Sequence, residues 1–255
     1  MLIIKKVTDW KSLRSSSLLR NQKLGFVPTM GALHPGHLSL IKKSKKENQK
    51  TVVSIFINPT QFNDKKDLKK YPRTLNDDIK KLRTEKVDFL FQPDAKEIYS
   101  DKFNYKVSEN NISRIMCGAF RPGHFDGVLT VVMKLLNIIE AENAYFGEKD
   151  YQQYRLVKDM AKAFFLKTKI IPLKIIREKD GLAMSSRNRL LKPSERQIAP
   201  KLNEFLNSKK SSKQIMKLIN SAGFKTEYIK EIWKRRFISA KLGKVRLIDN
   251  VKIKG

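Results

Sequence analysis

The sequence has little of several residue types, and each shortage excludes a class of protein. Cys117 is the only cysteine in 255 residues, so neither an internal disulfide nor a cysteine-built zinc site is possible. No run of about 18 apolar residues occurs, so we expect no segment that spans a membrane. The first residues, MLIIKKVTDW, place apolar side chains before lysines and lack a small-residue cleavage site. This order is wrong for a secretory signal, and we expect a cytoplasmic protein.

Acidic residues are also scarce. The chain has 54 Lys and Arg residues against 25 Asp and Glu, which gives a formal net charge of +29. Such a charge raises the hypothesis of a nucleic-acid partner. The lysines are nevertheless spread over the chain, as in Lys42-Lys43, Lys65-Lys66 and Lys80-Lys81, and no RNA- or DNA-binding motif accompanies them. We therefore expect a solvated basic surface that attracts small anionic substrates, with a basic nucleic-acid-binding protein as the alternative from another class.

The stretch from Gly25 to Leu40, GFVPTMGALHPGHLSL, has the pattern of strand, glycine-containing turn and helix. Its glycines are spaced as in a P-loop, but His37 and Leu38 stand where that motif needs lysine and a hydroxyl. A helix N-terminus offers unpaired N–H groups to an anion, and two imidazoles beside it can donate to phosphate oxygens. The alternative is that His34 and His37 only cap the turn. Because two of the three histidines flank one glycine here, we predict a phosphate site.

Further strands are expected to alternate with helices along the chain. The strand candidates are Thr51 to Ile57, Val87 to Phe91, Ala144 to Phe146 and Lys169 to Ile176. This alternation predicts an α/β fold, a doubly wound parallel, Rossmann-like sheet whose ligand crevice lies at the carboxyl ends of the strands. Asn58 and Gln61 follow the first of these strands and fall beside the histidine turn.

The segment between the first two of these strands divides into two parts. Asp64 to Tyr71 is expected to be a charged loop, and Leu75 to Glu85 an amphipathic helix with Thr74 as its N-cap. Asp77 and Asp78 in the first turn of that helix either serve the helix dipole or lie near a metal ion.

Three later loops carry side chains suited to anions. Arg121 and His124 precede an apolar helix from Leu129 to Leu136, where an anion is favourable. Lys149 lies in a short turn after a strand, and Asp150 and Gln153 share one face of the helix that follows. Hydroxyls and a guanidinium in a flexible loop suit a triphosphate, and the loop that begins at Gly181 supplies Ser185, Ser186 and Arg187.

The last part of the chain changes character. We expect a helix from Pro193 to about Leu206, a shorter one from Ser212 to Ala222, and two or three antiparallel strands between Glu227 and Asp249. This pattern predicts a second, smaller α+β C-terminal domain. The expected division is 1–176 for the Rossmann-like domain and 177–255 for a small lid domain.

These motifs, taken together, resemble those of one known family. The H-x-G-H pattern at His34 to His37 is similar to that of the nucleotidyltransferase superfamily, whose members split a nucleoside triphosphate at the α-phosphate. The longer string FVPTMGALHPGHLSLI resembles the pantoate–β-alanine ligase (pantothenate synthetase) family. Further strings resemble it in the same order along nearly the whole chain: NPTQF, YPRT, RPGHFDGV, GEKDYQQ, MSSRN and GKVRLIDN.

The resemblance implies ATP-dependent condensation of pantoate with β-alanine through a pantoyl-adenylate, with ATP and Mg²⁺ required, AMP and pyrophosphate released, and a homodimeric enzyme. No residue is assigned as a metal ligand. The implied catalytic residues are His34, His37 and Lys149. The implied ATP-binding residues are Pro28, Met30, Gly36, His37, Gly147, Lys149, Asp150, Ile176, Met184, Ser185, Ser186 and Arg187. The implied pantoate-binding residues are Gln61, Gln153, Val132, Leu135, Arg121 and His124.

The sequence departs from the family pattern in one place. The stretch from Tyr228 to Lys234 runs almost directly into Arg235, and a hairpin segment that normally lies between them is missing. This puts the sheet of the small domain in doubt but leaves the catalytic motifs untouched. The nearest alternative function is an H-x-G-H enzyme that adenylylates a phosphate. Such an acceptor site would need extra cations, whereas Gln61 and Gln153 offer neutral donors.

Overall fold

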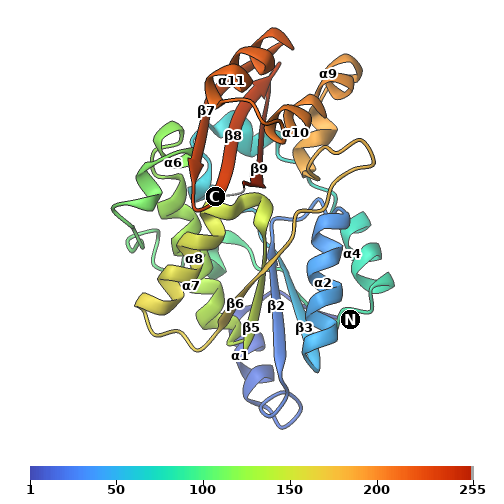
Figure 1. The fold of residues 1–255 in the computed structure, drawn as a ribbon. Helices are drawn as coiled ribbons and strands as arrows, with labels where there is room; N and C mark the ends of the chain where they lie inside the picture. The colour runs from blue at the N-terminus through green and yellow to red at the C-terminus, as the bar shows by residue number, and fades with distance from the viewer. Residues whose placement is uncertain (254–255) are drawn as a thin grey trace. The chain divides into compact units, whose positions relative to one another are not determined.

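The computed structural model of the protein describes residues 1–253 and divides the chain into two compact units (Figure 1). The N-terminal unit comprises Met1–Glu148 and Gln152–Leu173. The C-terminal unit comprises the short turn Lys149–Tyr151 together with the chain from Lys174 onwards. Each unit is described by itself below.

The N-terminal unit is built on a parallel sheet with the strand order β1-β4-β3-β2-β5-β6, which confirms the predicted α/β class. Short strand β1 was not predicted, because three residues carry too little pattern. In Figure 1, helices α2 and α4 lie on one side of this sheet and α7 and α8 on the other. The strands are β1 Leu2–Ile4, β2 Leu24–Thr29, β3 Lys50–Ile55, β4 Phe89–Phe91, β5 Asn143–Gly147 and β6 Lys169–Leu173.

The core of this unit forms because the central strands are apolar on both faces. Val27, Val53 and Leu90 from three neighbouring strands are fully buried with Ile41 from α2 and Leu82 from α4. Near-continuous apolar runs are typical of parallel strands that are covered on both sides.

The helices and turns between these strands are α1 Val7–Ser15, α2 Pro35–Glu47, η1 Pro59–Gln61, α3 Lys65–Lys70, α4 Leu75–Thr84, α5 Ala95–Ile98, η2 Ile112–Arg114, α6 Cys117–Phe120, α7 His124–Ile139, η3 Glu148–Asp150 and α8 Tyr151–Ala163. Within η3 and α8, the residues Lys149–Tyr151 belong to the C-terminal unit.

Helix α3 corrects one expectation. Residues Asp64 to Tyr71 were predicted to be a loop, but Lys65–Lys70 is helical. The Asp64 side chain accepts a hydrogen bond from the Lys66 N–H at 2.7 Å, so it caps the helix. The helix is too short and too charged to show an apolar periodicity.

Strands β2 and β5 separate at their carboxyl ends. Strand β2 pairs with β3 along its whole length to Thr29, but its pairing with β5 ends at Phe26. Pro28 lies where the two strands part, a position at which the missing N–H of proline costs no hydrogen bond to β5. The strand order reverses direction between these same two strands, and open α/β sheets bind ligands at such a switch point.

The C-terminal unit contains η4 Ser186–Leu190, α9 Pro193–Ile198, α10 Lys201–Leu206, α11 Ser212–Ser221, β7 Phe224–Ile232, β8 Arg235–Leu242 and β9 Val245–Lys252. The strands form an antiparallel sheet in the order β7-β8-β9, which confirms the predicted α+β character. The single helix expected from Pro193 to Leu206 is divided in two at Ala199 and Pro200, because proline cannot continue the hydrogen bonds of a helix. Leu202, Ile215 and Ile238 are fully buried in its core.

The missing hairpin segment does not disrupt this sheet. Ile232 pairs directly with Arg235, so Trp233 and Lys234 alone connect β7 to β8. Both residues have a φ of +54°, the left-handed conformation that two-residue hairpin turns require. The shortened sequence therefore closes as a tight turn with the register of the strands intact.

Candidate functional site

The histidine turn lies directly after β2, at the N-terminus of α2. His34 is the N-cap, and its Nδ1 accepts a hydrogen bond from the Gly36 N–H at 3.1 Å. The His34 N–H in turn points to Nδ1 of His37 at 3.4 Å, which completes a capping box. The two rings lie 4.0 Å apart between centroids, and both are half-buried. The capping role is therefore real, and it defines the geometry of both side chains.

Capping also fixes the protonation of these rings. Because Nδ1 of each ring accepts a backbone hydrogen bond, the proton of each neutral imidazole belongs on Nε2. The Nε2–H group lies on the opposite side of the ring from Nδ1. The local structure thus makes two oriented N–H donors at a helix N-terminus, which is an arrangement suited to phosphate oxygens.

The loop that carries Gln61 is held by a buried asparagine. Asn58 is 1% exposed; its Oδ1 accepts from the Tyr99 hydroxyl at 2.7 Å, and its Nδ2 donates to the Gly127 carbonyl at 3.0 Å and to Gln61 Oε1 at 3.1 Å. Burial raises the pKa of Tyr99, which keeps its hydroxyl neutral and able to donate. The Gln61 Nε2 also lies 3.1 Å from the Met30 sulfur, so these two predicted site residues are in contact.

Arg121 and His124 lie beside this loop and contact its backbone. Arg121 Nη2 donates to the Gln61 carbonyl at 3.1 Å, and His124 Nδ1 lies 2.8 Å from the same oxygen. His124 is buried, and its Nε2 lies 3.0 Å from Arg121 Nη1. The structure thus brings Gln61, Arg121 and His124 together. In these contacts the two basic side chains bind the main chain of Gln61.

Helix α7 supplies an apolar wall next to the same loop. Val132 and Leu135 are buried and lie three residues apart, on one face of the helix. Gly127 lets the helix approach closely: a Cβ there would lie 2.5 Å from the Thr60 carbonyl oxygen and 2.7 Å from the Gln61 nitrogen. The glycine of the RPGHFDGV string is therefore required by the packing of α7 against η1.

The two adjacent glutamines of α8 have different surroundings. Gln152 is buried, accepts from the Cys117 N–H at 3.1 Å, and donates to the Ile112 and Ile115 carbonyls, each at 2.8 Å. Gln153 is half-buried and makes no side-chain hydrogen bond to another residue in the described part of the chain. The side chain of Gln152 thus holds the 112–117 segment. Gln153 is the predicted ligand-binding residue, and its amide makes none of these contacts.

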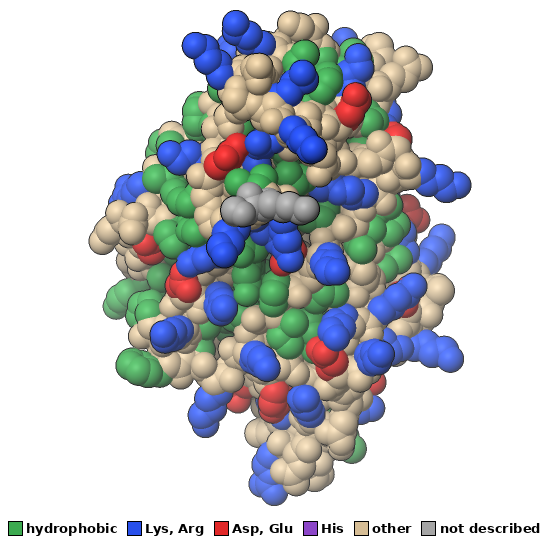
Figure 2. Space-filling view, in the orientation of Figure 1, with side chains coloured by type: hydrophobic (Ala, Val, Ile, Leu, Met, Phe, Trp, Pro, Cys, Tyr) green, Lys and Arg blue, Asp and Glu red, His purple; other side chains and the backbone are tan. Residues whose placement is uncertain are grey.

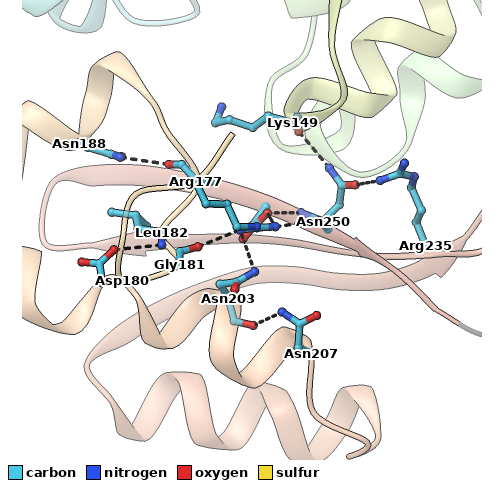
Figure 3. A network of polar contacts seen from close by, with 12 residues as sticks. Lys149, Arg177, Asp180, Gly181, Leu182, Asn188, Asn203, Asn207, Arg235 and Asn250 are labelled. Carbon is cyan, nitrogen blue, oxygen red and sulfur yellow. Dashed lines mark hydrogen bonds and ion pairs between the residues drawn. The ribbon is translucent and has the colours of Figure 1, made fainter. Parts of the chain in front are cut away.

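In the C-terminal unit, the Lys149–Tyr151 turn is attached to β8 and β9 (Figure 3). The buried Asn250 donates to the Lys149 carbonyl at 3.1 Å, and its Oδ1 accepts from Arg235 Nη1 at 2.6 Å. The Arg235 guanidinium lies 4.2 Å from the centre of the Tyr151 ring, a cation–π contact. Lys149 Nζ forms an ion pair with Asp150 at 3.5 Å, and Asp150 is exposed.

The loop that carries Ser185 to Arg187 follows a short hairpin between Ile176 and Met184 that is held by several hydrogen bonds. The Met184 N–H donates to the Ile176 carbonyl at 3.0 Å, and Arg177 forms two hydrogen bonds with Asp249, at 2.7 and 2.9 Å. Burial would raise the pKa of Asp180 in this hairpin, but hydrogen bonds from Arg196 and from the Leu182 N–H outweigh it and lower that pKa. The sequence indicated a flexible loop, whereas these contacts fix its first half.

Ser185 and Ser186 follow this hairpin. The Ser185 hydroxyl accepts from the Arg187 N–H at 3.2 Å and caps η4, while Ser186 is buried. The serines and Arg187 are thus presented on a short, capped turn.

Comparison with known proteins gives a consistent result. The family model for pantoate–β-alanine ligase matches residues 2–252. The pantothenate synthetase of Legionella pneumophila is 48% identical over 250 residues, which cover 98% of this chain and 99% of that protein. The pantothenate synthetase of Bdellovibrio bacteriovorus is 50% identical over 230 residues, which cover 90% and 92%. The chain belongs to the pantoate–β-alanine ligase family.

Solved structures agree with this assignment. The ligase from Francisella tularensis, crystallised with beta-gamma ATP and beta-alanine, has a TM-score of 0.94 and 47% identity. The match covers 99% of this chain and 97% of that one. Pantothenate synthetase from Thermus thermophilus has a TM-score of 0.90 and 34% identity, with full coverage of both chains. The present ligase is therefore an enzyme that joins pantoate to β-alanine with the use of ATP.

The described residues contain no group of three or more His, Cys, Asp and Glu side chains that could hold a metal ion. None of the described helices of the ligase is both long and apolar enough to cross a membrane. On the face shown in Figure 2, Lys and Arg side chains are scattered over the surface and do not gather in one patch.

Proposed function

We propose that the ligase activates pantoate by adenylation. The carboxylate of pantoate attacks the α-phosphate of ATP, and pyrophosphate leaves. The amine of β-alanine then attacks the acyl carbon of the pantoyl-adenylate, and AMP leaves as pantothenate forms. Neither step requires a covalent bond to the protein, so the side chains act by positioning and by stabilising charge.

His34 and His37 stabilise the charge that builds up on the departing pyrophosphate. The observation that carries this proposal is the capping box, because it leaves Nε2–H as the donor of each neutral ring at a helix N-terminus. Lys149 supplies a positive charge to the phosphates in the same step. Preorganised donors of this kind need no reorientation as the transition state forms.

Pantoate binds next to the η1 loop. Gln61 and Gln153 supply neutral hydrogen-bonding groups to its hydroxyl and carboxylate, and Val132 and Leu135 line the surface for its two methyl groups. Arg121 and His124 contribute to this site through the Gln61 carbonyl that both contact. Neutral donors favour a carboxylate acceptor over a phosphorylated one, which would need additional cations.

The resemblance to the family assigns ATP to the H-x-G-H turn and to the GEKDYQQ and MSSRN strings. The proposed ATP ligands are Pro28, Met30, Gly36, His37, Gly147, Lys149, Asp150, Ile176, Met184, Ser185, Ser186 and Arg187. Mg²⁺ would enter with the nucleotide, bound to its phosphates. The division into domains 1–176 and 177–255, the homodimer and the cytoplasmic location remain proposals from the sequence.

Pyrophosphate exchange tests the proposed order. Labelled pyrophosphate should enter ATP when pantoate is present and β-alanine is absent. Exchange that ignores pantoate and runs with a phosphorylated acceptor would instead identify a phosphate-adenylylating enzyme. Salt-sensitive RNA binding without any exchange would favour the nucleic-acid-binding alternative.

A further inference from the structure

A buried carboxylate of α4 holds the turn that precedes the catalytic histidines. Asp78 is 1% exposed. Its Oδ2 accepts from the Ala32 N–H at 2.8 Å, and its Oδ1 accepts from the Leu33 N–H at 2.7 Å. Thr74 adds a third donor, with its hydroxyl 3.2 Å from Oδ2. Both carboxylate oxygens are thus engaged by N–H and O–H donors, a set of partners that suits an anion.

The turn held by Asp78 has an unfavourable backbone. Gly31 and Ala32 have φ values of +79° and +51°, and the second is a conformation that residues with a Cβ adopt rarely. The N–H groups of Ala32 and Leu33, which follow one another in this turn, both point at the carboxylate. A turn of this kind persists only when its surroundings hold it. Asp78 supplies that support from a separate helix.

Lys81 holds the same turn through the next peptide group. Its Nζ donates to the Leu33 carbonyl at 2.7 Å. That carbonyl and the His34 N–H belong to one peptide plane, and the His34 N–H points to Nδ1 of His37. A chain of contacts therefore runs from Lys81, through the Leu33–His34 peptide, to the ring of His37. Hydrogen bonds in such a series polarise one another.

We propose that Asp78 and Lys81 are positioning residues for His34 and His37. They set the Leu33–His34 peptide, and through it the direction in which each Nε2–H points. This inference rests on the proposed role of the histidines in adenylation. The contacts give Asp78 a role that the sequence did not indicate, since each of its carboxylate oxygens accepts a backbone hydrogen bond from the turn before His34. A displacement of about 1 Å in such a site lowers a rate by about 100-fold.

The chain offers a matched control for each residue. Asp159 is an exposed acidic residue on α8 of the same unit, and Lys80 is the more exposed neighbour of Lys81. Asp78→Asn keeps the shape of the side chain but turns an NH₂ group toward a backbone N–H. It should lower the rate of pantoate-dependent pyrophosphate exchange about 10- to 100-fold at saturating substrate. Lys81→Met should lower it less, and Asp159→Asn and Lys80→Met should leave it unchanged.

A double-mutant cycle separates positioning from a general loss of structure. If Asp78 acts through the histidine turn, Asp78→Asn should cost little further activity in a His37→Ala background, because the group that it positions is gone. If the double variant instead loses activity by the product of the two single-variant factors, the proposal is overturned. Should Asp78→Asn fail to fold, the same cycle is run with Lys81→Met.

The imidazole NMR signals give a readout that does not depend on activity. The chain has three histidines, and His124 serves as the internal reference. Asp78→Asn should shift the ring ¹⁵N signals of His34 and His37 and leave those of His124 in place. A loss of activity without these shifts overturns the positioning role. Shifts in a ligase whose His37→Ala variant retains full exchange activity would uphold positioning and contradict the proposed role of the histidines.

Discussion

The side-chain amide of Asn250 donates a hydrogen bond to the backbone carbonyl of Lys149 at 3.1 Å. Arg235 completes the attachment, since it donates to Asn250 Oδ1 and lies over the ring of Tyr151. The turn that carries the proposed catalytic lysine is thus held on both sides of Asp150. The GKVRLIDN string near the end of the chain supplies the asparagine, so this string bears on the position of Lys149.

Loss of the Asn250 amide should slow adenylation. In Asn250→Ala the Lys149 carbonyl loses its donor and the turn gains freedom, and we expect pyrophosphate exchange to fall about 10-fold, within the range for modest misplacement of a catalytic group. The control is Asn207→Ala, which removes an exposed amide that donates to the Asn203 carbonyl in the same unit. A folded Asn250→Ala ligase with the wild-type exchange rate would contradict this prediction.

The two histidines and Lys149 should matter for rate far more than for stability. His34→Ala, His37→Ala and Lys149→Ala should each lower the adenylation rate about 10²- to 10³-fold. His34→Ala should also cost about 1 kcal/mol of stability, because it removes the N-cap of α2. His34→Asn separates the two effects, since asparagine can cap the helix but lacks the Nε2–H donor. Full activity in His34→Asn would reduce His34 to a capping residue.

Gly127→Ala should disturb the pantoate site through the backbone. The added methyl would lie 2.5 Å from the Thr60 carbonyl oxygen, so η1 must move with Gln61. We expect destabilisation of about 1–3 kcal/mol, as for overpacked cores, and a raised KM for pantoate with little change in KM for ATP. Asn137→Ala, on the exposed side of the same helix, is the control for melting temperature. An equal rise in both KM values would point to a general defect.

Arg187→Ala should uncouple adenylate formation from its use. Loss of the guanidinium should slow adenylation, and a less well covered adenylate should be hydrolysed before β-alanine arrives. The measurement is AMP formed per pantothenate formed at limiting β-alanine, with the exposed Arg189→Ala as the control. If the ratio keeps its wild-type value while the rate falls, Arg187 binds phosphate without protecting the intermediate.

The Asp180 hairpin should contribute stability that depends on pH. Because the pKa of Asp180 is lowered in the folded ligase, its contribution is fully present above the unfolded value of about 3.9 and is lost as pH falls below it. Asp180→Asn should therefore unfold at lower urea than wild type at pH 7, and the gap should narrow as the pH falls below that unfolded value. A gap that is constant with pH would mean that Asp180 contributes through packing alone.

The sequence allowed the parallel sheet and the position of the histidine turn to be predicted, because buried strands and helix starts have local patterns. Helix α3 was missed because it depends on one cap, at Asp64. The contacts of Arg121 and His124 were also missed, because a helix N-terminus does not tell whether a nearby cation faces a ligand or a carbonyl. Asp78 shared one pattern with Asp77, and only the fold distinguishes the buried carboxylate from the exposed one.

The two-residue turn between β7 and β8 also limits how far the side chain of Trp233 can lie from the rest of the sheet. Trp233, at the tip, keeps its left-handed backbone while its ring lies 5.7 Å from Phe237 and 6.3 Å from Tyr151. Because the turn has only two residues, the indole stays within contact of the Tyr151 ring, which belongs to the turn that carries Lys149. The length of this connection therefore bears on the position of the turn that carries Lys149. Inserting residues between β7 and β8 should misplace Lys149, although none of the inserted residues would contact a substrate.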